Sequence, residues 1–67
     1  MKRWMNIELT YDESRLMVKM MREEGFRFET SALDTYTDGK PDIHIEILVE
    51  QRSDLEFLNE WVSDNLF

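Results

Sequence analysis

The sequence predicts an α+β fold in which two helices pack on one face of a three-stranded sheet, in the chain order β-α-β-β-α. The spacing of apolar residues along the 67-residue chain changes between a period of two, typical of strands, and a period of three to four, typical of helices. Helix-capping sequences and a turn-forming glycine stand where this spacing changes. These observations predict a two-layer sandwich formed by one domain over residues 1–67.

A capping sequence joins the first strand to the first helix. Apolar and polar side chains alternate over residues 5–9, which predicts a strand with one buried face. Thr10 and Glu13 have the spacing of a capping box, so we expect a helix over 11–24 that ends at Gly25. Apolar residues at helical spacing predict its buried face: Leu16, Met17, Met20 and Met21. We interpret these methionines as core residues that fill irregular gaps rather than as an adaptable recognition groove.

Two strands joined by a tight turn are expected next. Residues 26–37 and 43–49 both alternate with a period of two, and Asp38-Gly39 between them is a hairpin signal because glycine tolerates positive φ. A two-residue turn there sets the predicted register, which pairs Thr30 with Ile47, Phe28 with Val49 and Arg27 with Glu50.

The last element is predicted to be a helix over residues 54–66. Ser53 and Glu56 have the spacing of a second capping box. Apolar residues then recur at helical spacing, at Leu55, Leu58, Val62 and Leu66, with Trp61 beside them.

The connections between the strands predict the sheet order. Strands joined through a helix run parallel, so a third strand between them gives the order 1-3-2. Both helices would then cover the face that carries Ile7, Phe28 and Ile45, and the other face would stay open. This arrangement resembles part of a ferredoxin-like fold that lacks its final strand. The resemblance is architectural and implies no function.

Composition narrows the environment and the classes of partner. The chain contains no cysteine, no stretch of about 20 apolar residues and no apolar signal-peptide segment, so we expect a cytoplasmic protein. Residues 1–28 carry 6 Lys/Arg and 5 Asp/Glu, whereas residues 29–67 carry 2 and 10. The two parts therefore differ in net charge, +1 against −8. Such a surface repels nucleic acid and anionic lipid and favours basic partners.

The sequence contains no recognisable catalytic, cofactor or metal motif, and we expect a non-enzymatic protein. His44, the only histidine, lacks a recognisable nucleophile partner and is interpreted as a sheet-surface residue. Asp34, Asp38 and Asp42 flank the turn, yet they lack the spacing of a calcium loop. With only two glycines, the chain has no glycine-rich phosphate-binding loop.

Acidic residues form two candidate partner-binding surfaces. Glu56, Glu60 and Asp64 stand at i, i+4 and i+8 of the last predicted helix, with no Lys or Arg after Arg52 to neutralise them. The second expected surface is a cluster on the open sheet face around His44, compensated only by Arg27 and formed by Glu8, Glu29, Asp42, Glu46 and Glu50.

These surfaces favour a protein-binding inhibitor or regulator whose carboxylates mimic nucleic acid and bind a basic partner, such as a nucleic-acid-binding protein. Small phage-encoded inhibitors of nucleases, CRISPR effectors (anti-CRISPR proteins) or polymerases are similar in size and acidity, a likeness of composition without a shared motif. The alternative is a small structural or self-associating domain, such as a homodimer, whose acidity serves solubility. Direct nucleic-acid binding on the sheet is disfavoured, because the open face offers Trp4 but little aromatic interleaving, and its acidic residues would repel phosphate unless metal ions intervened.

Overall fold

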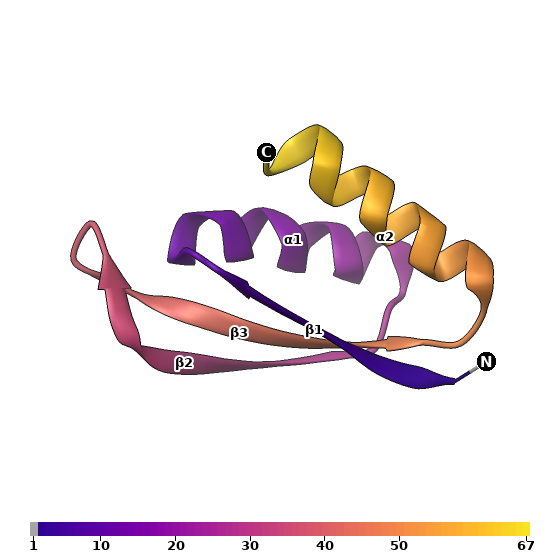
Figure 1. Ribbon diagram of the computed structural model, residues 1–67, viewed down its shortest axis with the longest axis horizontal. Coiled ribbons are helices and arrows are strands. Elements are labelled where there is room, and N and C mark those ends of the chain that lie inside the picture. The colour runs from indigo at the N-terminus through magenta and orange to yellow at the C-terminus, as the bar shows by residue number, and fades with distance from the viewer. Residues whose placement is uncertain (1) are drawn as a thin grey trace.

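The computed structural model, which describes residues 2–67, has the element order β1-α1-β2-β3-α2 (Figure 1). The elements are β1 (Arg3–Leu9), α1 (Tyr11–Glu24), β2 (Phe28–Thr37), β3 (Lys40–Val49) and α2 (Arg52–Asn65). The strands form one sheet in the order β1-β3-β2, and the central strand β3 is antiparallel to both neighbours. Both helices lie on the same face of this sheet (Figure 1). The predicted α+β class, strand order and helix placement are confirmed.

Side-chain and glycine caps set both ends of α1. The backbone N–H of Glu13 donates to Thr10 Oγ1 at 3.3 Å, and the backbone N–H of Thr10 donates to Glu13 Oε1 at 3.0 Å. Gly25 ends the helix with φ at 80°, in the left-handed region that favours glycine. The predicted capping box and helix end are therefore confirmed.

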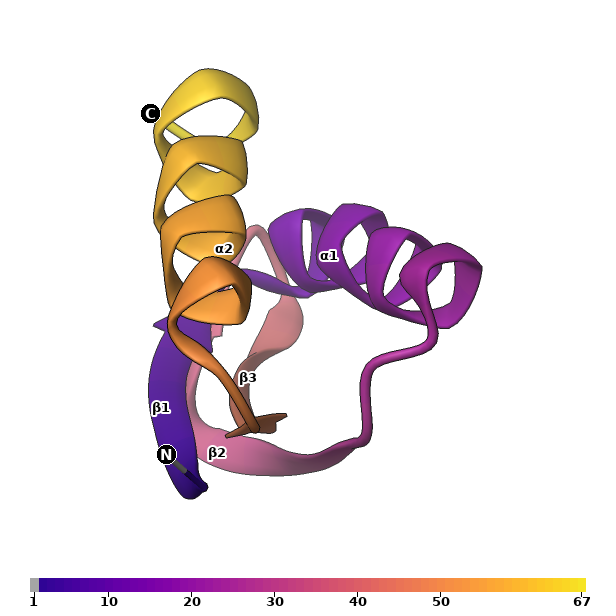
Figure 2. The same ribbon diagram turned by 90° about the vertical axis from the view of Figure 1, so that its right-hand side faces the viewer.

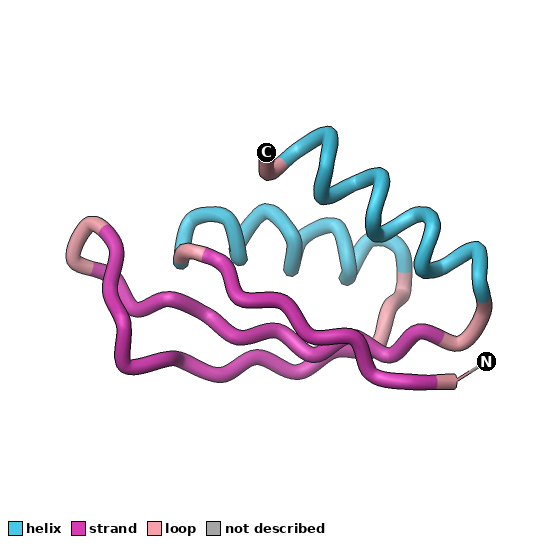
Figure 3. The backbone as a smooth tube through the Cα atoms, in the orientation of Figure 1, coloured by secondary structure: helices cyan, strands magenta, loops and turns pink. Residues whose placement is uncertain are grey.

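The hairpin turn forms as predicted, but the register beyond it does not. Asp38 and Gly39 both have positive φ, at 53° and 77°, as a two-residue turn between twisted strands requires. Next to the turn Tyr36 lies opposite Pro41, which is the predicted alignment. Further along, β2 is shifted by two residues relative to β3 (Figure 3 shows both strands). The observed pairs are Phe28 with Ile47 and Thr30 with Ile45, and Leu48 N–H donates to the Arg27 carbonyl at 2.9 Å.

A bulge in β2 causes this shift. Ala32 pairs with Ile43 and Tyr36 pairs with Pro41, so residues 33–35 of β2 lie opposite Asp42 alone. The hydroxyls of Thr35 and Thr37 donate to the Asp42 carboxylate at 2.7 and 2.8 Å. A shift of two residues keeps each side chain on its predicted face. The predicted pairing of Arg27 with Glu50 is wrong, but the face assignment of β2 is retained.

The last helix begins two residues earlier than predicted. Gln51 is the N-cap residue, and the Asp54 carboxylate accepts hydrogen bonds from the backbone N–H groups of Glu50 and Gln51, both at 3.2 Å. Ser53 lies inside the first turn and is not the cap. The sequence Ser53 to Glu56 imitates a capping box, but Asp54 reaches the free N–H groups from the third helical position and so fixes the earlier start.

The core lies between the helices and the inner face of the sheet. Its fully buried side chains come from α1, β3 and α2: Met17, Met21, Ile45, Ile47, Val49 and Leu58. The methionines of α1 are thus core residues, as predicted. Leu16 is 54% exposed, and its predicted place in the core is wrong because α1 turns Met17 and Met21 toward the sheet. The rings of Phe26 and Phe57, 5.9 Å apart between centroids, join the α1–β2 connection to α2.

Candidate functional site

The acidic ladder, defined as Glu56, Glu60 and Asp64, lies on the exposed side of α2. All three side chains are exposed, and Leu58 on the same helix is fully buried. Figure 2 shows α2 rising from the sheet beside α1. No Lys, Arg or His nitrogen lies within 4 Å of a ladder carboxylate in residues 2–67. The structure therefore displays the three predicted carboxylates together, with no cation of the same chain beside them.

This acidic ladder works against the stability of its own helix. Like charges four residues apart destabilise a helix by about 0.2–0.5 kcal/mol for each pair. Asp64 also stands in the last turn of α2, where the helix dipole disfavours an anion, and no basic residue occupies that turn. The two like-charge pairs and the position of Asp64 thus weaken α2, and Arg52, four residues before Glu56, is the one basic residue of this helix.

The sheet face opposite the helices brings together part of the second predicted surface. Glu8 and Ser31 flank His44 on the neighbouring strands, and Glu29 lies directly opposite Glu46. His44 Nε2 lies 2.9 Å from Asn6 Oδ1 and 3.9 Å from Glu46 Oε1. Like charges directly opposite on two strands are destabilising, so the pair of Glu29 and Glu46 is a second acidic feature, with His44 beside Glu46.

Two of the predicted sheet-face acids have other placements. The Asp42 carboxylate accepts hydrogen bonds from the hydroxyls of Thr35 and Thr37 and so stabilises the bulge. Glu50 follows the last residue of β3, in the connection to α2. Glu8, Glu29 and Glu46 therefore lie nearest to His44 on this face, and Asp42 lies on the same strand at the end with the bulge.

Apolar side chains occupy one end of the same sheet face. Leu48 pairs with Trp4 and is only 6% exposed, whereas Trp4 is 46% exposed. Leu48 is therefore buried, although its side chain lies on the face opposite the helices. The sheet face is mixed in character, unlike the acidic ladder on α2.

A basic stripe on α1 is the surface that sequence reasoning missed. Arg15, Lys19 and Arg22 are all exposed and stand at i, i+4 and i+7. Averaging charge over residues 1–28 concealed them, because five acids in that segment nearly cancel its six cations. The helical spacing of the three cations is the signal that would have revealed the stripe.

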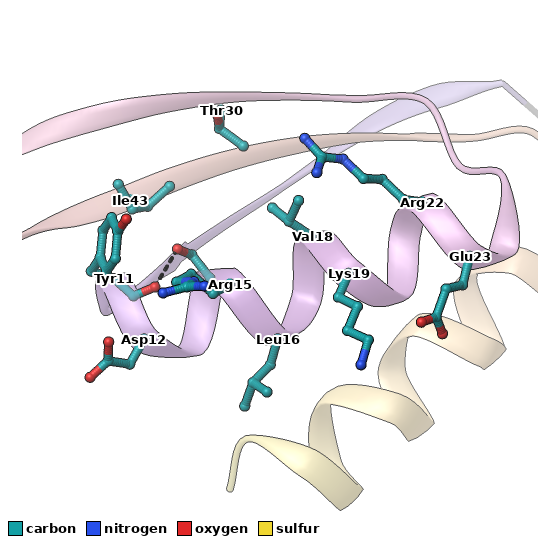
Figure 4. Close-up of a pocket in the computed structure, with 11 residues that line it drawn as sticks. Tyr11, Asp12, Arg15, Leu16, Val18, Lys19, Arg22, Glu23, Thr30 and Ile43 are labelled. Atoms are coloured by element: carbon teal, nitrogen blue, oxygen red, sulfur yellow. Dashed lines mark hydrogen bonds between the residues drawn. The ribbon is translucent and has the colours of Figure 1, made fainter.

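This basic stripe borders a groove of about 780 Å³ between α1 and the inner faces of β2 and β3. Figure 4 shows Val18 and Arg22 pointing from α1 toward the strands, while Lys19 points away from them. Thr30 lines the groove and is exposed although it faces the helix layer. The groove exists because α1 packs on β3 and β1 and leaves the inner face of β2 partly uncovered.

These surfaces present charged side chains that a binding partner can contact. His44 has Asn6 and Glu46 as its side-chain partners. Within residues 2–67, no group of three His, Cys, Asp or Glu side chains is arranged to hold a metal ion. Carboxylates of the acidic ladder can accept paired hydrogen bonds from arginine, and the basic stripe can donate them.

Comparison of the chain with protein-family models, with curated proteins and with solved structures gave no match. The surfaces are therefore interpreted from their geometry and charge. In the part of the chain that the structure describes, neither helix has the length and apolar character needed to cross a bilayer.

Proposed function

We propose that this chain is a non-enzymatic protein-binding module of the cytoplasm, an inhibitor or regulator that presents the acidic ladder of α2 to a basic partner. The observation that supports this most directly is the alignment of three exposed carboxylates without a cation beside them. A costly row of like charges is understandable when a partner supplies the opposite charge.

The spacing of the acidic ladder suits a surface that binds nucleic acid. Residues four apart on a helix are separated by about 6 Å along its axis. Phosphates of one DNA strand advance by about 3.4 Å each along the duplex axis and also wind around it, so the ladder carboxylates have a spacing of the same order as neighbouring phosphates. Lys and Arg side chains in a nucleic-acid-binding groove could therefore pair with the ladder, and occupation of that groove would block the nucleic acid.

The acidic ladder is the primary contact in this proposal, and the sheet-face pair of Glu29 and Glu46 is secondary. The ladder projects from a helix without competing side-chain partners. On the sheet, Glu46 lies near His44, and the apolar pair of Trp4 and Leu48 occupies one end of the face. The negative charge offered to a partner's basic groove is therefore more uniform on α2 than on the sheet face.

The test is displacement of labelled duplex DNA from a panel of nucleic-acid-binding proteins that includes nucleases, polymerases and RNA-guided effectors. We expect the wild-type chain to displace DNA from at least one member. Neutralising the ladder with E56Q/E60Q/D64N should weaken displacement at least about tenfold, since each lost charge contact contributes on the order of 1 kcal/mol.

The matched control is E24Q/D34N/D38N, which removes three exposed carboxylates outside the ladder and changes the net charge equally. We expect the control to displace DNA as the wild type does. Equal loss in both variants would contradict the proposal and support acidity that acts through net charge alone. No displacement from any member of the panel would also contradict it.

A further inference from the structure

The groove beside α1 combines an apolar wall with unpaired cations. Tyr11, Val18 and Ile43 contribute apolar surface, and Arg15, Lys19 and Arg22 contribute positive charge. None of these three cations has a carboxylate within 4 Å among residues 2–67. This surface is therefore complementary to an acidic segment that also carries apolar side chains.

The acids that line the groove do not cancel the basic stripe. Asp12 at one end is already paired with Lys40, whose Nζ lies 3.0 Å from its Oδ1. Glu23 at the other end is the remaining acid of the lining. Three free cations against one free carboxylate leave the groove positive within a chain whose formal net charge is −7.

The same chain carries a segment of matching chemistry, the helix α2. From its first to its last residue the acidic ladder rises by eight helical steps, about 12 Å, and the basic stripe rises by seven, about 10.5 Å. Phe57, 37% exposed, and the half-buried Trp61 lie on α2 at positions next to the ladder. The two helices therefore display charged rows of opposite sign and similar length, each without an ion-pair partner among residues 2–67.

We propose that the occupant of this groove is α2 of a second copy, so that two chains form a reciprocal dimer. The acidic ladder of each copy contacts the basic stripe of the other, and Phe57 packs against the apolar wall. In a dimer with a two-fold axis, the ladder and the stripe of each chain both contact the other chain. Neither surface is then left free to bind a third chain. This inference does not rest on the proposed basic partner, because it concerns the chain alone.

The dependence of dimerisation on salt concentration distinguishes this charged contact from an apolar one. At about 0.1–0.15 M ionic strength, charges interact over about 8–10 Å, so the opposed rows attract while the net charges of the two copies are largely screened. At about 0.01 M the range grows to about 30 Å and net repulsion opposes the dimer, whereas at about 1 M the rows themselves are screened. Dimerisation is therefore strongest at intermediate salt.

The test is sedimentation equilibrium of the full chain, whose monomer mass is 8.2 kDa. We expect wild-type protein to dimerise at 0.15 M salt. The variants R15E/K19E/R22E and E56K/E60K/D64K should each dimerise at least about tenfold more weakly, because each places like charges at the contact. An equimolar mixture of these two variants should restore association to within about threefold, because their altered rows are complementary.

Two controls keep the result specific. Circular dichroism verifies that each variant is folded, and the milder set R15Q/K19Q/R22Q replaces the first variant if it is not. R15E/K19E/R22E should gain no comparable association when mixed with E24K/D34K/D38K, because that variant still has an acidic ladder that opposes the altered row, while E24K/D34K/D38K alone should dimerise as the wild type does. Wild-type protein that is monomeric at 0.15 M salt up to sub-millimolar concentration would overturn the inference. Unrestored association in the charge-swapped mixture would overturn it as well.

Discussion

Lys40 and Asp12 form an ion pair, with 3.0 Å between Nζ and Oδ1, that joins the β2–β3 turn to the first turn of α1. The Lys40 ammonium also lies 5.4 Å from the centroid of the Tyr11 ring. The two charged side chains are 50% and 71% exposed, so solvent screens the pair. Its main consequence is local, because it neutralises an acid at one end of the α1 groove.

Replacing Lys40 with Met separates these two effects. We expect the free energy of unfolding to fall by no more than about 0.2–1 kcal/mol, the range for exposed ion pairs. The freed Asp12 carboxylate should weaken dimerisation more than this small loss of stability implies. Urea denaturation and sedimentation of the same sample measure both quantities, and a dimerisation constant equal to that of the wild type would contradict a role of groove charge.

Reversing the middle charge of the acidic ladder should stabilise the fold. In E60K the new ammonium stands four residues from both Glu56 and Asp64, so two repulsive pairs become attractive. The expected gain in the free energy of unfolding is about 0.8–2 kcal/mol. Urea denaturation provides the measurement, while the DNA-displacement test should show a loss of activity in the same variant. Lower stability in E60K would show that the ladder charges do not repel one another in the folded helix.

Leu58 holds α2 on the rest of the fold. It is the only fully buried residue of this helix, and truncation to Ala should lower the free energy of unfolding by about 2–5 kcal/mol. Phe67 is 88% exposed and serves as the control, since its truncation should change stability by less than about 0.5 kcal/mol. Thermal unfolding of both variants tests this contrast, and equal effects would contradict the observed packing of α2.

Asp42 should stabilise the bulge of β2. Substitution by Ala removes the acceptor of the Thr35 and Thr37 hydroxyls and should cost about 0.5–2 kcal/mol. Amide hydrogen exchange should accelerate over residues 33–37 and stay unchanged at the opposite end of β2, near Phe28. Uniform acceleration along β2 would show instead that Asp42 supports the whole strand.

The parts of the fold that the sequence predicts are those with local causes. The Thr10 and Glu13 cap, the glycine at the end of α1 and the Asp38-Gly39 turn each involve neighbouring residues, and all three form as predicted. Alternation of apolar residues likewise predicted the buried face of β3.

The failures depend on interactions that residue spacing does not encode. A turn determines the register only beside itself, and the Asp42 contacts with Thr35 and Thr37 permit two extra residues in β2. The start of α2 moved because Asp54 caps it from within. Leu16 is exposed because the rotation of α1 on the sheet depends on the packing of Met17 and Met21.

The candidate surfaces were likewise predictable from the sequence only where they depend on neighbouring residues. The acidic ladder required only a correct helix, and the structure displays it as the sequence indicated. The sheet-face cluster required the relative placement of three strands, and the sequence alone did not indicate that Thr35 and Thr37 bind Asp42 or that Glu50 follows the end of β3. The groove beside α1 required knowledge of which strand the helices leave uncovered.

The most direct test of the central claim compares DNA displacement by wild-type chain, the ladder variant E56Q/E60Q/D64N and the equally charged control E24Q/D34N/D38N. The measurement is made at a chain concentration below that of dimerisation, so that self-association does not contribute. We expect displacement by the wild type and the control and a loss of at least about tenfold in the ladder variant alone. Equal displacement by all three proteins would contradict it.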